Sequence, residues 1–144
     1  MVKRLVIYSD GGARGNPGPA AAAFLAMENS EIIKTDTQFL GIRTNNQAEY
    51  EALTMGLEYA LNTGAEEVIC YLDSELVGRQ MKGEYSVKNL ELRKLYLKAH
   101  AIRIRFKKAE FYNVARSNSF IQKADALVNK TLDNNASIVR SNNK

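Results

Sequence analysis

The sequence predicts an α/β domain in which helices pack on a mixed β-sheet. Three observations indicate this class. β-Rich runs with short connections fill the chain up to Arg43, and a helical period of apolar residues begins only after it. Helical stretches then alternate with two further β-rich runs, which is typical of crossovers between parallel strands. The expected order is β-β-β-α-β-α-β-α, and we expect a mixed sheet with helices on its faces.

The first half of the chain is expected to contain three strands and a helix. The three β-rich runs are residues 4–9, 20–27 and 31–41. Because the turn at 28–30 is short, the strands that it joins should form an antiparallel meander. The alanines at 20–23 make the second strand ambiguous. Apolar residues recur at helical spacing over 48–61, and Asn62-Thr63-Gly64 ends that helix.

The second half alternates helices and strands. The expected elements are a strand at 67–72, helical stretches at 74–81 and 88–101, a strand at 103–112 and a helix at 120–132. The charges along 103–107 indicate either a nucleic-acid-binding stripe or an edge strand protected against aggregation, and we favour the edge strand. We expect one domain over residues 1–133 and a polar, flexible tail at 134–144.

Composition narrows the class of protein. Apolar residues make up 45% and charged residues 25%, which are ordinary values for a globular domain. The single cysteine, Cys70, allows no disulfide framework and indicates a reducing compartment. No run approaches the about 18 apolar residues of a membrane span, and the N-terminus turns polar too soon for a signal peptide. We therefore expect a soluble, cytoplasmic protein without membrane contact. The net charge of +4 is compatible with a nucleic-acid partner but is weak support for one.

An aspartate follows each of two apolar strands. Asp10 follows residues 4–9, and Asp73 follows residues 67–72. Ligands bind at the carboxyl ends of parallel strands, so neighbouring strands would place these carboxylates side by side. Alternatively, Asp73 caps the helix that begins near Ser74, since aspartate is a common N-cap residue.

Two further acids lie on helix faces that should be buried. At 100° per residue, Glu49 falls in the middle of the apolar stripe of its helix, where an unpaired carboxylate is costly. An interaction with the helix dipole explains its first-turn position but not its inward direction. Asp125 shares the face of Ile121, Val128 and Leu132, although less cleanly.

These four acids come from four separate elements. Converging carboxylates repel one another, and a divalent cation is the usual remedy. Oxygen ligands without His or Cys favour Mg²⁺ or Mn²⁺ over zinc. Two such ions, about 4 Å apart, clamp the attacking and leaving oxygens of a phosphodiester. The residues alone therefore predict metal-dependent phosphoryl chemistry.

Four stretches resemble the type 1 ribonuclease H family: YSDGGARGNPGP (8–19), TNNQAEYEAL (44–53), YLDSELV (71–77) and KADALVN (123–129). They occur in the family's order, and the similarity extends to about residue 133. The resemblance implies a ribonuclease H-like fold with a five-stranded mixed sheet flanked by helices. It also implies an endonuclease that hydrolyses the RNA strand of RNA–DNA hybrids with two Mg²⁺ ions, for which Mn²⁺ substitutes. The family's catalytic, metal-binding acids fall on Asp10, Glu49, Asp73 and Asp125.

The resemblance further implies a substrate-binding set: Gly11, Gly12, Asn16, Thr44, Asn45, Asn46, Gln47 and Ser74. The glycine-rich stretch is not a P-loop, because no Gly-Lys-Ser/Thr follows it. Its first two glycines would let the backbone approach the substrate, and the Asn16 amide would reach a base edge or a ribose hydroxyl. The segment before Glu49 would hold a phosphate at a helix N-terminus, although Asn46 is alternatively the N-cap.

The chain departs from the family pattern in two places. The loop before Asp125 lacks the histidine that many relatives carry, and the only histidine, His100, is expected near a helix end. We expect proton transfer to rely on metal-bound water, with Asn113, Arg116 or Asn118 in a lesser role. The stretch at 82–94 also lacks the basic protrusion with which some relatives grip the hybrid, so we expect weaker binding.

The expected partner is an RNA–DNA hybrid bound by a monomer, and cleavage of double-stranded RNA is left open. Two rival functions also remain: a non-catalytic module of the same fold, and a junction resolvase or integrase core. All four acids are present, which argues against the first. The 44–53 stretch argues against the second.

Overall fold

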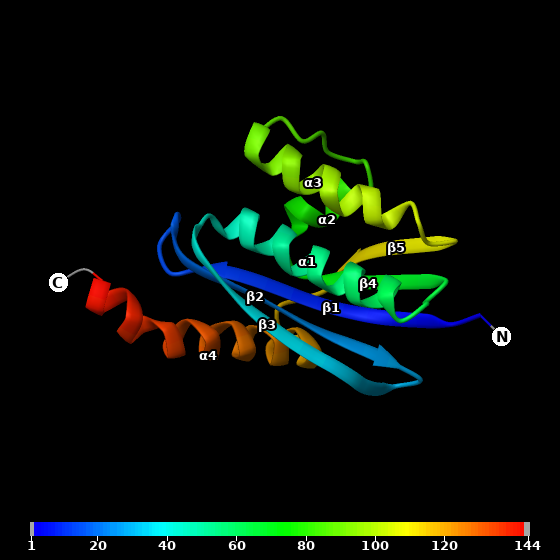
Figure 1. Cartoon of the computed structure of the whole chain (residues 1–144). Helices are drawn as coiled ribbons and strands as arrows, with labels where there is room; N and C mark the ends of the chain where they lie inside the picture. Colours follow the sequence, from blue (N-terminus) through cyan, green and yellow to red (C-terminus); the bar gives the residue numbers. More distant parts are fainter. Residues whose placement is uncertain (1, 143–144) are drawn as a thin grey trace.

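The computed structural model describes residues 2–142, which form five strands and four helices (Figure 1). In chain order they are β1 (Arg4–Ala13), β2 (Gly18–Glu28), β3 (Glu31–Arg43), α1 (Asn45–Asn62), β4 (Glu67–Leu72), α2 (Glu75–Met81), α3 (Leu90–Arg103), β5 (Lys108–Asn113) and α4 (Ser119–Asn142). No helix in this part of the chain combines the length and apolar character needed to span a bilayer.

The five strands form one mixed sheet in the order β3-β2-β1-β4-β5. β1, β2 and β3 make an antiparallel meander, whereas β4 lies parallel to both β1 and β5. Helices α1, α2 and α3 lie on one side of the sheet and α4 on the other (Figure 1). The predicted five-stranded mixed sheet flanked by helices is confirmed.

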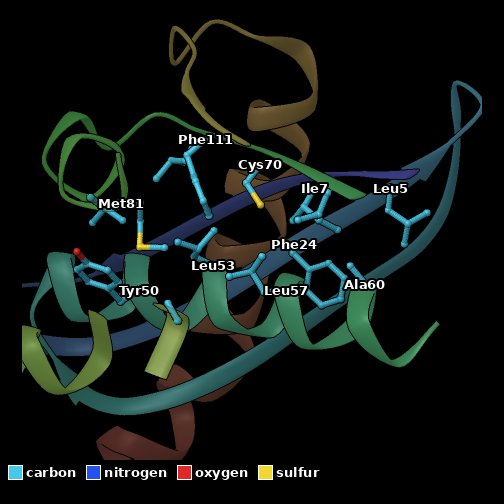
Figure 2. Close-up of a cluster of buried hydrophobic side chains, with 14 of the residues drawn as sticks. Leu5, Ile7, Phe24, Tyr50, Leu53, Leu57, Ala60, Cys70, Met81 and Phe111 are labelled. Atoms are coloured by element: carbon cyan, nitrogen blue, oxygen red, sulfur yellow. The ribbon is translucent and has the colours of Figure 1, made fainter. Parts of the chain in front are cut away.

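The main core lies between the sheet and α1 (Figure 2). Leu5 and Ile7 of β1 are fully buried against it, since alternate residues of a strand point to the same face. α1 approaches β1 so closely that a Cβ on Gly56 would lie 2.4 Å from Cγ2 of Ile7. This close packing holds α1 directly on β1.

The alanines at 20–23 lie in β2 and are completely buried. They pair with β1 on one side and β3 on the other. Ala21 and Ala23 pack against Val128 and Leu132 of α4. The four alanines therefore belong to a buried strand and not to a helix. This resolves the ambiguity of the second predicted strand.

β1 is longer than predicted. It continues through Asp10 to Ala13, because β2 goes on pairing with it: Asp10 stands opposite Ala23. The parallel pairing of β1 with β4, in contrast, stops at Tyr8 and Tyr71. Asp10 thus lies inside a strand but beyond the end of the parallel ladder.

Two other predicted boundaries are wrong. Residues 103–107 are not in a strand, since α3 runs to Arg103, the backbone N–H of Ile104 closes the helix on the His100 carbonyl, and β5 starts only at Lys108. β5 is an edge strand, but residues 103–107 precede it, so the interpretation of their charges as protection of an edge strand is wrong. α4 continues to Asn142, well beyond Leu132. Residues 143–144 of the predicted tail lie outside the described residues, and the domain division at 133 stays a prediction.

Candidate metal centre

Asp10 and Asp73 lie side by side beyond the end of the β1–β4 ladder. The last parallel pair is Tyr8 with Tyr71, so each aspartate follows its own strand's tyrosine by two residues. Asp73 does not cap α2, because Ser74 is the N-cap and its hydroxyl accepts a hydrogen bond from the Val77 backbone N–H at 3.2 Å. The capping alternative for Asp73 is therefore wrong.

Glu49 reaches the same place from α1. A Cβ on Gly11 would lie 2.2 Å from the carbonyl oxygen of Ala48, so the first turn of α1 rests directly on β1 beside Asp10. The Glu49 side chain is 7% exposed. Its predicted inward direction is confirmed, and it cannot be explained by the helix dipole alone.

Together these acids form a compact cluster of carboxylates. One oxygen from each of Asp10, Glu49 and Asp73 lies within 4.8 Å of the others. Within residues 2–142, Oε2 of Glu49 is buried and has no hydrogen-bond partner. The nearest cation is Arg116, whose Nε lies 3.3 Å from Oδ2 of Asp73, and its side chain is 90% exposed.

The surroundings of these acids oppose their ionisation. Burial, followed by the charges of Asp73 and Asp125, raises the pKa of Asp10 to about 7. Burial and the charges of Asp10 and Asp73 raise the pKa of Glu49 well above its usual range. Without a counter-charge the cluster therefore holds protons near neutral pH.

The donor set fits a hard divalent cation. It consists entirely of carboxylate oxygens, which Mg²⁺ and Mn²⁺ prefer. The buried, unpartnered Oε2 of Glu49 is an oxygen that a cation would satisfy.

The pH dependence of stability tests this electrostatic arrangement. Between about pH 4 and pH 7 the metal-free folded protein binds more protons than the unfolded chain, because the folded pKa of Asp10 is raised. The free energy of unfolding should therefore fall as the pH rises through this window, by an amount on the order of a few kcal/mol. Urea unfolding in EDTA measures it. In Asp10→Asn the free energy of unfolding should depend less on pH over this window. If it falls equally steeply in the variant and the wild type, the raised pKa of Asp10 is contradicted.

Asp125 occupies a different position from the other three acids. It is exposed, because the buried stripe of α4 is centred on Ile121, Ala124, Val128 and Leu132 and leaves Asp125 at its margin. The expectation that it faces inward with that stripe is wrong. It still lines the pocket that contains the other acids, and its charge raises the pKa of Asp10.

A pocket of about 370 Å³ surrounds the acids. Five of the predicted substrate-binding residues line it: Gly11, Gly12, Asn45, Asn46 and Ser74. The structure also places Arg14 and Asn129 in its wall, which the sequence motifs did not single out. Both lie inside stretches that resemble the family, 8–19 and 123–129, but no acidic or amide pattern there marked them as residues of the site.

The other three predicted substrate residues do not line the pocket. Thr44 and Gln47 form a reciprocal capping box at the start of α1, so Thr44 is the N-cap and the alternative for Asn46 is wrong. Asn16 is joined to α1, since its Oδ1 accepts a hydrogen bond from the Asn45 backbone N–H at 3.0 Å. Asn45 in turn accepts one from the Ala13 N–H at 2.8 Å.

Of the three residues considered for proton transfer, only Arg116 contacts an acid of the cluster. Asn113 donates its amide to the Ser74 carbonyl at 2.7 Å, and Asn118 accepts hydrogen bonds from the first backbone N–H groups of α4. His100 lies near the end of α3, as predicted, and contacts Arg103.

Sequence comparisons identify a matching family model and relatives that are 35–39% identical to this chain. A family model described as reverse transcriptase-like matches residues 8–131. The bifunctional protein Rv2228c of Mycobacterium tuberculosis is 39% identical over 132 residues, which cover 90% of this chain and 36% of that protein. Ribonuclease HI of Halobacterium salinarum is 35% identical over 131 residues, which cover 90% of this chain and 65% of that protein. The chain thus spans about a third of the length of the mycobacterial relative.

Solved structures share the fold closely. The N-terminal ribonuclease H domain of the mycobacterial protein has a TM-score of 0.90 at 37% identity, covering 95% of this chain and 99% of that one. Ribonuclease H1 of Halobacterium salinarum has a TM-score of 0.86 at 35% identity, covering 91% and 98%. LC11 ribonuclease H1, solved in complex with an RNA/DNA hybrid, has a TM-score of 0.84 at 36% identity, covering 90% and 97%.

Proposed function

Because the chain belongs to the type 1 ribonuclease H family, we propose that it is an endonuclease that hydrolyses the RNA strand of RNA–DNA hybrids. The observation that carries the proposal is the cluster of Asp10, Glu49 and Asp73, whose oxygens lie within 4.8 Å of one another in an open pocket. The related LC11 enzyme was solved with an RNA/DNA hybrid, which supports this class of substrate.

The carboxylates account for the metal dependence. Asp10, Glu49 and Asp73 would hold two Mg²⁺ ions, with Asp125 as a further ligand from α4, and Mn²⁺ should substitute. When bound, the ions supply Lewis-acid stabilisation of the charge that develops on the phosphodiester. Protons that Asp10 and Glu49 hold in the metal-free protein would leave as the cation binds, so metal affinity should increase with pH.

The surrounding residues would position the hybrid. At the N-terminus of α1, Asn16 and Thr44 accept hydrogen bonds from the Asn45 and Gln47 backbone N–H groups. The Asn46 N–H between them would donate to a backbone phosphate. Asn45 fixes the loop that carries Asn16 by two hydrogen bonds. The Asn16 oxygen is engaged there, which leaves its amide nitrogen to donate to a ribose hydroxyl or base edge, the contacts by which RNA is told from DNA. The exposed Arg116 would exchange its Asp73 partner for the phosphate of the substrate.

A substrate panel tests the proposal against its rivals. Labelled RNA–DNA hybrid, double-stranded RNA, double-stranded DNA and a four-way junction are incubated with the protein in Mg²⁺ and in Mn²⁺. We expect cleavage within the RNA strand of the hybrid. Tight binding without cleavage would favour the non-catalytic module, and junction cleavage would favour a resolvase. Light scattering on the same samples checks the predicted monomer.

Salt dependence tests how the hybrid is held. Because 82–94 carries no basic protrusion, few phosphate contacts are expected. The affinity for the hybrid should then fall about 10- to 100-fold between 50 and 200 mM salt, less than the about 10³-fold or more that accompanies six to ten contacts. Fluorescence anisotropy in Ca²⁺, which should prevent turnover, measures it. An affinity that hardly changes with salt would contradict phosphate-based binding.

A further inference from the structure

Arg14 links the two sides of the pocket. It follows β1 directly, and its Nη2 contacts two acceptors on α4, far away in the chain. One is Oδ1 of Asp133 at 2.6 Å, and the other is the backbone carbonyl oxygen of Asn129 at 3.3 Å. One guanidinium therefore holds a full turn of α4 against the end of β1.

That turn of α4 also contacts Asp125. Asp125, Asn129 and Asp133 are spaced by four residues and therefore lie on one face of the helix. The Asn129 side-chain amide donates a hydrogen bond to Oδ2 of Asp125 at 3.3 Å. Among the residues that the structure describes, the Asp125 side chain accepts this hydrogen bond from Asn129, and its other close polar neighbour is the carboxyl group of Asp10. A continuous path of contacts thus leads from Arg14 through Asn129 to Asp125.

The two ends of this path differ in how firmly they are held. The loop after β1 has its own anchor on α1, because Asn45 bonds both Ala13 and Asn16. Asp125 has no comparable anchor: it is exposed and stands outside the compact group of three acids. Loss of Arg14 should therefore disturb Asp125 more than it disturbs the loop.

We propose that Arg14 is a positioning residue that orients Asp125 through Asn129 and so sets its distance from the other three acids. The inference rests on the proposed function, in which Asp125 contributes to the cation site. Stability alone does not account for the contact, because an ion pair whose side chains are 45% and 66% exposed contributes little to folding. The link also uses a backbone carbonyl beside Asp125, which a simple surface ion pair would not need.

The test compares Arg14→Ala with a matched control. Arg4→Ala removes another 2.6 Å ion pair, with Glu67, at the opposite end of β1. For Arg14→Ala we expect kcat to fall about 10-fold with KM within about 2-fold, as for a misplaced catalytic group. The Kd for Mn²⁺, from calorimetry without nucleic acid, should rise about 5-fold. Asn129→Ala should reproduce both changes, Arg14→Lys should recover part of them, and Arg4→Ala should change neither.

Several outcomes would overturn the inference. One is an Arg14→Ala variant whose kcat and Mn²⁺ affinity both stay within about 2-fold of wild type. Another is a Tm that falls by much more than the about 3 °C expected for loss of a surface ion pair, together with a fall in kcat and a rise in KM by similar factors. This combination would indicate a structural role. If the wild type cleaves no hybrid, the proposed function fails, whereas the Mn²⁺ titrations of the four variants still decide whether Arg14 organises the acids.

Discussion

Asp10→Asn is expected to lower the rate of hybrid cleavage by about a thousand-fold while the protein stays folded. Asp10 belongs to the cluster of three acids whose oxygens lie within 4.8 Å of one another, and it also interacts with Asp125. An amide keeps the shape of the side chain but removes its charge, so a cation loses a ligand that it cannot recover. Loss of several kcal/mol of transition-state stabilisation corresponds to about this factor. Single-turnover cleavage of labelled hybrid in Mg²⁺ measures it.

The same variant should be more stable than wild type when metal is absent. Asp10 is 6% exposed, and its charge is opposed by burial and by the neighbouring carboxylates. Neutralising it should therefore raise the free energy of unfolding at pH 8 in EDTA. Asp36→Asn, which changes an exposed aspartate on β3, serves as the control and should affect neither property. An Asp10→Asn protein that cleaves at more than a tenth of the wild-type rate would refute the assignment.

Gly11→Ala is expected to destabilise the protein by about 3 kcal/mol and to disrupt the metal centre. The added Cβ would lie 2.2 Å from the Ala48 carbonyl oxygen and 2.6 Å from the Glu49 backbone nitrogen. These are backbone atoms of α1, so no side-chain rotation relieves the overlap. The first turn of α1 must then move away from β1, and it carries Glu49 away from Asp10.

Gly12→Ala provides a matched control for this effect. It adds the same methyl group one residue further along β1, where the nearest atom, a Val128 methyl, would lie 3.8 Å away. Urea unfolding and Mn²⁺ calorimetry on both variants separate the two positions. We expect a large loss of stability and metal affinity for Gly11→Ala only. Equal losses in the two variants would contradict the argument that the packing of α1 against Gly11 sets the stability and the metal affinity.

Local sequence patterns predicted helices and strands well where the spacing of apolar residues and the residues that end an element indicate the same boundary. The strand at 67–72 has the predicted bounds, and α1 ends at Asn62 before Gly64, whose φ is +84°. Predictions failed where the same local pattern is compatible with more than one backbone structure. Alternation of apolar and charged residues over 102–107 indicated a strand, but those residues form the end of α3 and a turn. The last helix was expected to end near Leu132, where the apolar period stops, yet the backbone remains helical to Asn142.

The sequence by itself predicted a cation site, because burying a charged carboxylate is so unfavourable that Glu49 on an apolar stripe must be neutralised in some way. It also determined the fold class, since helical and strand periods are local properties. Only the tertiary structure decided how the acids meet: three form a compact cluster, the exposed Asp125 approaches Asp10 from α4, and Gly11 admits the first turn of α1. Contacts such as Arg14 with Asn129 join residues more than a hundred positions apart, and no local pattern encodes which distant side chain will be adjacent.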